Sequence, residues 1–163
     1  MAETSVLVRA ATPGDMAAVG RLGAQLVAQH HAFDPQRFIP GGGDVAEGYG
    51  WFLGTQLEEP EVVILVAERA GEVVGYVYAA LEPHSWKELR EAAGFVHDVV
   101  VDASARRLGV ATRLVEAACA WLRAHGAPRV LLWSATPNLA AQALFDRLGF
   151  RRTMVEMTRE LGS

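Results

Sequence analysis

The stretch RRLGVA, residues 106–111, lies between the apolar run Val99-Val100-Val101 and a long helical pattern that begins near Val110. A plain surface turn favours Asn, Asp, Gly or Pro, whereas this turn carries two arginines, a glycine and small residues. The first amides of a helix have no intrahelical partner and carry partial positive charge. A strand, a glycine turn and a helix start therefore indicate an anion site, usually for phosphate. For this motif alone, a solvated basic pair in a purely geometric turn stays an open alternative.

The composition is that of one ordinary globular domain. The chain has 163 residues, 51% hydrophobic and 21% charged, so we expect a single domain over residues 1–163. The net charge of −4 argues against nucleic acid as a partner and is compatible with a cationic small substrate. Cys119 is the single cysteine, which excludes an internal disulfide. The pair His30-His31 lacks further ligands at a recognisable spacing, so we predict no metal.

Signals for membranes and secretion are missing from the sequence. No stretch is long and apolar enough to span a membrane. The start, MAETSVLVRA, lacks the basic and apolar regions of a signal peptide. We therefore expect a cytoplasmic protein without a membrane partner.

Hydrophobic periodicity predicts a mixed sheet covered by helices. The β-branched run 62–68 and the run 73–81 are separated by a short turn, which is typical of an antiparallel hairpin. Capping signals such as Thr12-Pro13-Gly14-Asp15 begin the helical stripes. The predicted strands are 6–9, 62–68, 73–81, 95–101, 129–134 and 150–161, and the predicted helices are 12–31, 45–57, 107–125 and 136–149. This order indicates an α/β (α+β) fold with helices packed on the sheet.

A second motif, NLAAQALFDRLGF at residues 138–150, strengthens the interpretation of the glycine turn. With it, the sequence resembles the GNAT superfamily of acetyl-CoA-dependent N-acetyltransferases. In that family a strand ending like Val99-x-Val101 leads into [Q/R]-x-x-G-x-[G/A], matched here by Arg106, Gly109 and Ala111. A later helix has the pattern N-x-x-A-x-x-L-[Y/F]-x-x-x-G-F, matched from Asn138 to Phe150. The resemblance covers about residues 62–150.

The resemblance implies a fold and a cofactor. The fold would be a mixed, mostly antiparallel sheet with a central splay, flanked by about four helices. The cosubstrate would be acetyl-CoA, its pyrophosphate on the amides that begin the helix and its pantetheine arm along the strand. The expected cofactor contacts are Val99, Val100, Val101, Arg106, Arg107, Leu108, Gly109, Val110, Ala111, Thr112, Asn138, Ala141 and Phe145.

Acetyl transfer to an amine needs a base, and His97 is the candidate. The two-residue period of a strand places His97 on the face of Val99 and Val101, and places Asp98 on the opposite face. A satisfied or merely exposed histidine is the alternative for His97, and a structural or substrate-side hydrogen bond is the expected role of Asp98. Phe145 stands where the family often has a tyrosine acid. The thiolate then leaves unprotonated, takes a proton from water, or takes one from Ser134.

The acceptor site is expected among the first two helices, the segment 32–43 and the segment 82–94. The candidate residues are His30, Tyr49, Trp51, Glu82 and Trp86, although the two tryptophans are equally compatible with core or loop packing. The predicted function is N-acetylation of a primary amine of a small molecule by direct attack. The alternatives are a peptide or protein amine acetyltransferase and a non-catalytic acyl-CoA sensor. A homodimer is a further option.

Overall fold

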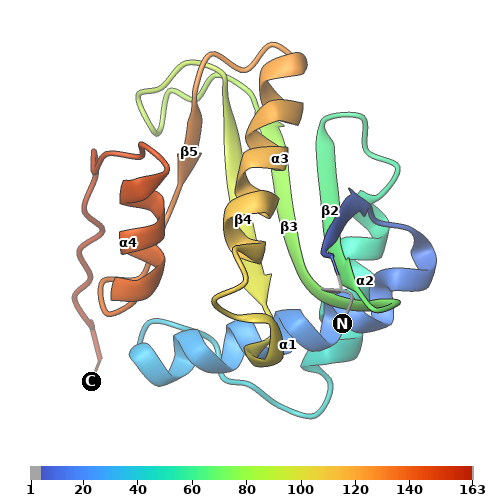
Figure 1. Cartoon of the computed structure of the whole chain (residues 1–163). Helices are drawn as coiled ribbons and strands as arrows, with labels where there is room; N and C mark the ends of the chain where they lie inside the picture. The colour runs from blue at the N-terminus through green and yellow to red at the C-terminus, as the bar shows by residue number, and fades with distance from the viewer. Residues whose placement is uncertain (1–4, 163) are drawn as a thin grey trace.

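The computed structural model describes residues 5–162 and contains within them one five-stranded sheet and four α-helices (Figure 1). The strands neighbour one another in chain order, from β1 to β5. All pairs are antiparallel except β4 with β5, which are parallel. The elements are β1 Leu7–Ala10, α1 Met16–Phe33, α2 Val45–Gln56, β2 Val62–Arg69, β3 Glu72–Glu82, β4 Ala93–Val101, α3 Val110–Ala124, β5 Val130–Leu132 and α4 Leu139–Arg147.

Helices cover both faces of this sheet, as the sequence predicts. On one face, α3 packs on β2, β3 and β4 through Val110, Leu114, Ala118 and Leu122, which recur at helical spacing and are buried. On the other face, α1 and α2 pack against each other and over Tyr76 and Val100. Figure 1 shows α3 in front of β4, with α1 and α2 toward the other end and face of the sheet. The mixed, mostly antiparallel sheet with flanking helices is therefore confirmed.

The sheet opens between β4 and β5. These strands pair over three positions only, from Gly94 opposite Val130 to Val96 opposite Leu132. β5 ends there, whereas β4 continues to Val101. The edge of β4 that faces β5 is consequently left without a neighbouring strand after Val96. The predicted central splay lies at this point.

Helix α3 begins later than its predicted start at residue 107. Residues 106–109 form a turn in which Arg107 has a φ of 65° and Gly109 a φ of 71°. A left-handed backbone is ordinary for glycine but cannot continue a right-handed helix. The first helical residue is therefore Val110.

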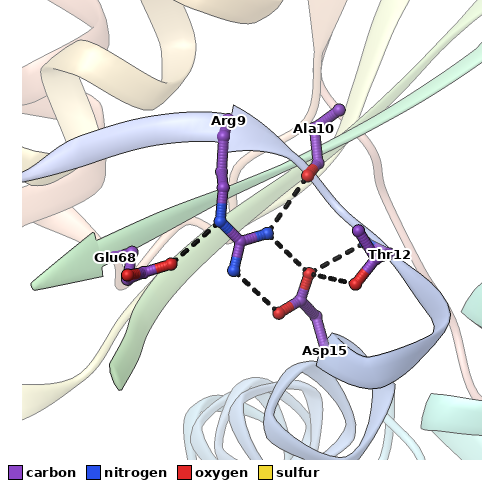
Figure 2. Close-up of polar contacts among 5 residues, drawn as sticks. All are labelled: Arg9, Ala10, Thr12, Asp15 and Glu68. Carbon is purple, nitrogen blue, oxygen red and sulfur yellow. Dashed lines mark hydrogen bonds and ion pairs between the residues drawn. The ribbon is translucent and has the colours of Figure 1, made fainter. Parts of the chain in front are cut away.

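An ion-pair network fixes the entry to α1 (Figure 2). The guanidinium of Arg9 on β1 donates to both carboxylate oxygens of Asp15, at 2.8 and 3.0 Å, and to Oε2 of Glu68 on β2 at 2.9 Å. Asp15 also accepts hydrogen bonds from the backbone N–H and the hydroxyl of Thr12. The Arg9 guanidinium lowers the pKa of Asp15 to about 2. This network joins β1, β2 and the first turn before α1.

The predicted last strand, 150–161, is wrong. Phe150 follows α4, and residues 151–162 have no regular secondary structure and are exposed throughout. Their alternating pattern is typical of a strand, but a strand also needs a neighbour, which a local pattern cannot supply. Among residues 5–162, the model contains no helix long and apolar enough to cross a membrane.

Candidate active site

A cavity of about 260 Å³ lies where β4 and β5 separate. Its walls come from α1 and the segment after it, from β4, and from the segment that joins β5 to α4. The structure brings many of the predicted site residues together here. Those that line the cavity are His30, His97, Asp98, Val99, Ser134, Asn138, Ala141 and Phe145.

A β-bulge in β4 decides how the catalytic candidates are presented. Tyr78 pairs with Asp98, but its neighbour Ala79 pairs with Val96, so His97 is an extra residue on β4. A bulge interrupts the two-residue alternation of side chains. His97 consequently contacts the ring of Tyr78, which packs on the α1 and α2 side of the sheet. The prediction that His97 shares a face with Val99 and Val101, opposite Asp98, is therefore wrong.

His97 is held by a carboxylate and two rings. Its Nε2 lies 2.9 Å from Oε1 of Glu82 on β3. The imidazole stacks on Phe95, with ring centroids 4.7 Å apart, and lies 5.0 Å from the Tyr78 ring. Its side chain stays 32% exposed. The ring is thus fixed in orientation and still accessible.

Asp98 lies deeper and, among residues 5–162, has no cationic partner at hydrogen-bonding distance. Its Oδ2 accepts a hydrogen bond from the hydroxyl of Tyr49 on α2 and, at 3.1 Å, one from Tyr76 on β3. Burial raises the pKa of this carboxyl, and the two hydroxyls oppose that shift only in part. Its Oδ1 has no hydrogen-bond partner among the described residues, yet no buried side-chain oxygen there is left unpaired. We infer that Oδ1 is reached from the cavity, which Asp98 lines.

The turn before α3 presents open backbone amides. Residues 108–112 donate no backbone hydrogen bond within the described chain, and the first such donor of α3 is Arg113, bonded to Gly109 at 3.1 Å. The positive φ angles of Arg107 and Gly109 bend the backbone around Leu108. Arg106, Arg107 and Leu108 are exposed beside these amides. An anion such as a pyrophosphate fits this arrangement.

The start of α4 forms the opposite wall. The side-chain oxygen of Asn138 caps the helix by accepting from the N–H of Ala141 at 3.2 Å. This cap explains why Asn precedes the helix, a position that a packing stripe alone does not explain. Phe145 is 7% exposed and lines the cavity. Ser134, which is exposed, follows the end of β5 on the same wall.

The acceptor candidates separate into two groups. His30 lines the cavity. Tyr49 hydrogen-bonds to Asp98, and Glu82 to His97, and both of these partners line the cavity. Trp51 instead lines a second hollow on the outer side of α1 and α2, and Trp86 is 83% exposed in the segment between β3 and β4. Sequence reasoning missed Tyr76, Phe38, Ile39 and Trp133. Tyr76 could have been found because it is two residues from Tyr78 in a strand whose interior is otherwise apolar.

Among the cofactor candidates, Val100 and Val110 have side chains that are buried in the core. Val100 is buried against Tyr76 on the α1 and α2 side. Val110 is 1% exposed in the core under α3. Only their backbone groups are therefore available to a ligand. In the part of the chain that the structure describes, no three His, Cys, Asp or Glu residues converge as metal ligands.

Comparisons with known proteins agree with this architecture. The model of the acetyltransferase (GNAT) family matches residues 27–150, more than half of the chain. A mycothiol acetyltransferase from Cellulomonas flavigena is 31% identical over 93% of this chain and 42% of its own length. An N-alpha-acetyltransferase from Sulfurisphaera tokodaii is 32% identical over 64% of this chain and 66% of its own length. The chain thus spans less than half of the mycothiol enzyme.

Solved structures share the whole fold. The aminoglycoside N-acetyltransferase AAC(6')-Iy in complex with CoA superposes with a TM-score of 0.73 and 19% identity, covering 97% of this chain and 96% of that one. At this identity the likeness concerns the fold alone.

Proposed function

The chain belongs to the acetyltransferase (GNAT) family, and we propose that it transfers an acetyl group from acetyl-CoA to a primary amine of a small molecule by direct attack. The observation that carries the proposal is the cavity at the splay. There, the His97 imidazole, hydrogen-bonded to Glu82, lies beside the half-buried Asp98 carboxylate, which has one open oxygen. Relatives and neighbours named for acetylating mycothiol and aminoglycosides support a small acceptor.

The residues around the splay fit coenzyme A. The open amides of residues 108–112 and the exposed Arg106 and Arg107 would hold its pyrophosphate. The unpaired edge of β4 at Val99 and Val101 would bond the pantetheine arm as a neighbouring strand does, and Asn138, Ala141 and Phe145 would line its other side. When bound, acetyl-CoA supplies the thioester whose carbonyl carbon receives the amine. No metal takes part in this proposal.

Asp98 would recognise the acceptor. A carboxylate oxygen that faces a cavity and has no partner there favours a hydrogen-bonding cation. The hydroxyls of Tyr49 and Tyr76 occupy Oδ2, so an ammonium group would bind Oδ1. His30, Phe38 and Ile39 line the same cavity. They favour an amine with an apolar part next to its ammonium group.

His97 would take the proton that the ammonium must lose before it attacks. With Glu82 2.9 Å from Nε2, the neutral ring would donate its N–H to this carboxylate and keep its lone pair on Nδ1. We assign Nδ1 as the proton acceptor and Glu82 as the residue that fixes this tautomer. Phe145 carries no hydroxyl, so the thiolate would leave unprotonated, which a thiol pKa of about 8.5 allows, or take a proton from water or Ser134.

Release of free thiol from acetyl-CoA, measured across a panel of amines, tests the proposal. The panel contains small monoamines, aminoglycosides and peptides with a free N-terminus. We expect thiol release with a small amine. Release with peptides alone would favour the peptide acetyltransferase. Binding of acetyl-CoA without release for any amine would favour the sensor.

A thermal shift measures cofactor binding separately. Acetyl-CoA should raise the Tm, because a ligand of the native state alone stabilises it. The matched variant Gly109→Val should lose the shift, because a β-branched residue strains the left-handed turn. No shift with the unmodified protein would contradict the cofactor assignment.

A further inference from the structure

Helix α2 contacts the cavity residue Asp98 through Tyr49. The hydroxyl of Tyr49 donates to Oδ2 of Asp98, and the hydroxyl of Tyr76 on β3 donates to the same oxygen at 3.1 Å. Tyr76 is fully buried within the sheet core, so its hydroxyl has a fixed place. Tyr49 is half-buried on a separate helix, so the place of its hydroxyl depends on how α2 packs.

Helices α1 and α2 approach closely because glycines on both leave no side chain between them. A Cβ at Gly20 would lie 2.2 Å from the carbonyl oxygen of Ala46, and a Cβ at Gly50 would lie 2.7 Å from that of Met16. A side chain at either position would push the helices apart. Backbone contact therefore sets the distance between the two helices.

Gly23 on α1 has a different neighbour, the ring of Tyr49 itself. A Cβ at this buried position would lie 2.2 Å from Cδ1, 2.7 Å from Cε1 and 2.9 Å from Cγ of Tyr49. Non-bonded carbon atoms are in contact at about 3.5–4.0 Å, so a methyl group and the ring cannot share this space. The Tyr49 ring occupies its place because residue 23 has no side chain.

The Tyr49 hydrogen bond helps to decide which oxygen of Asp98 is open. Both hydroxyls lie on Oδ2, and Oδ1 has no hydrogen-bond partner among residues 5–162. The terminal torsion of an aspartate side chain is broad, so one donor alone leaves the carboxylate able to turn. Two donors from two elements hold Oδ2 in place and leave Oδ1 to the cavity.

We propose that Gly23 and Tyr49 are positioning residues for the acceptor amine. Gly23 leaves room for the Tyr49 ring, Tyr49 holds Oδ2 of Asp98, and Oδ1 then faces the cavity where the ammonium group would bind. The part that concerns the amine rests on the proposed function, whereas the part that concerns Asp98 does not. Both residues act through Asp98 and touch none of the reacting atoms.

Two single substitutions and a matched control test these contacts kinetically, with the amine that gives most thiol release in the panel. Tyr49→Phe removes only the hydroxyl, and Gly23→Ala places a methyl group against the ring. Each should raise KM for the amine roughly tenfold, as expected for one lost hydrogen bond to a charged group, and change kcat less than about twofold. Gly48→Ala adds the same methyl group on α2, where a Cβ meets no atom within 4 Å, and should leave KM unchanged.

A second readout, independent of activity, is the titration of the Asp98 carboxyl carbon followed by NMR. Both substitutions should raise the pKa of Asp98, because each removes a donor that stabilises the charged carboxylate. The control variant should keep the midpoint of the unmodified protein. The titratable groups that remain near this carboxyl are the same in all variants: His30 on α1, Tyr76 and Tyr78 on β3, and His97 on β4.

The double variant Gly23→Ala/Tyr49→Phe shows whether both residues act through one hydrogen bond. Once the hydroxyl is gone, Gly23→Ala should add less than about twofold to KM, because its effect passes through that hydroxyl. Full additivity of the two substitutions would overturn the link from Gly23 to Asp98. If Gly23→Ala fails to fold in urea unfolding, Tyr49→Phe still decides the role of the hydroxyl.

The two readouts separate this proposal from the proposed function. An unchanged Asp98 midpoint in Tyr49→Phe would overturn the proposal whatever the kinetics, and so would a fall in kcat as large as the rise in KM. A raised midpoint with an unchanged KM would overturn the part that concerns the amine. If no amine in the panel releases thiol, the proposed function fails, while the midpoint still decides whether Tyr49 holds Asp98.

Discussion

Asp15 and Asp98 are both aspartates, but their hydrogen bonds and electrostatic environments differ. Asp15, at the entry to α1, is bonded through both oxygens to Arg9 and also accepts from Thr12. Asp98, at the cavity, has two tyrosine hydroxyls on one oxygen and none on the other. The pKa of Asp15 is lowered by its cation, and the pKa of Asp98 is raised by burial. Asp15 is buried and bonded through both oxygens, whereas Asp98 is half-buried and bonded through one oxygen.

Under the proposed function, this difference distinguishes a structural carboxylate, Asp15, from one that would bind a ligand, Asp98. A buried carboxylate paired with a cation stabilises the fold at neutral pH, whereas one buried without a cation opposes folding when it is charged. A chain gains nothing in stability from the second arrangement, so a ligand that completes its bonds is the natural explanation. Substitutions in the two clusters should therefore act on different measurable quantities.

The largest expected effect is on turnover when His97 is removed. His97→Ala should lower the rate at neutral pH by roughly 10²–10⁴-fold, which is typical of a positioned base. The affinity for acetyl-CoA should stay nearly unchanged, because the cofactor is proposed to meet the backbone of β4. The variant should recover partly at high pH, where more free amine exists. A variant that keeps the pH profile of the unmodified enzyme would remove His97 from the mechanism.

Asp98→Asn should weaken acceptor binding without weakening the fold. Loss of a charged hydrogen bond lowers kcat/KM by roughly 10- to 100-fold, mostly through KM. The unfolding free energy should stay equal or rise, because a buried charge is removed. Steady-state kinetics and urea unfolding measure both effects. A destabilised variant with normal KM would make Asp98 a structural residue like Asp15.

Asp15→Asn is the matched substitution in the other cluster. It removes one of the two carboxylates that bond the half-buried Arg9 guanidinium, with Glu68 remaining as the other, and should lower the unfolding free energy by about 1–2 kcal/mol. Turnover of the folded variant should change less than about twofold. Urea unfolding and the thiol-release assay measure the two quantities. A large loss of kcat would show that Asp15 also affects the active site, and Asp15 and Asp98 would then no longer differ in role.

The two carboxylates should contribute to the pH dependence of the unfolding free energy with opposite signs. The pKa of Asp15 falls from 3.8 to about 2 in the folded state, so its stabilisation is present above pH 3.8 and lost as pH drops through 2. After allowance for screening, this loss is about 1–2 kcal/mol. The raised pKa of Asp98 gives the opposite slope, with stability lost as pH rises above 3.8. Unfolding of Asp15→Asn and Asp98→Asn between pH 2 and 7 should show these opposite changes in slope.

Phe145→Tyr should have the smallest effect. A hydroxyl at the cavity wall restores the family's frequent acid, but a thiolate is already a tolerable leaving group. Turnover should change less than about tenfold in either direction, and acetyl-CoA binding should persist. A gain of about a thousandfold, or 4 kcal/mol of barrier, would instead indicate a sensor or an impaired enzyme.

Local chemistry made much of this protein predictable. Gly109 supplies the left-handed turn before α3, and Asn138 supplies the cap of α4. Both are local requirements that a few neighbouring residues reveal. Periodicity alone located β2, β3, β4 and the four helices. The glycine turn before α3 and the residues that line the splay follow from such patterns, because each depends on a few consecutive residues.

Contacts between distant segments decided the rest. The sequence by itself determined the order of strands and helices as far as α4, the glycine turn and the family. The bulge at His97 depends on how β3 pairs with β4, and the missing last strand depends on whether the chain after α4 returns to the edge of the sheet, which it does not in this fold. The partners of Asp98 come from α2 and β3, which only the packed fold brings together. Side-chain direction and pKa are set by neighbours far along the chain, so only the tertiary structure fixes them.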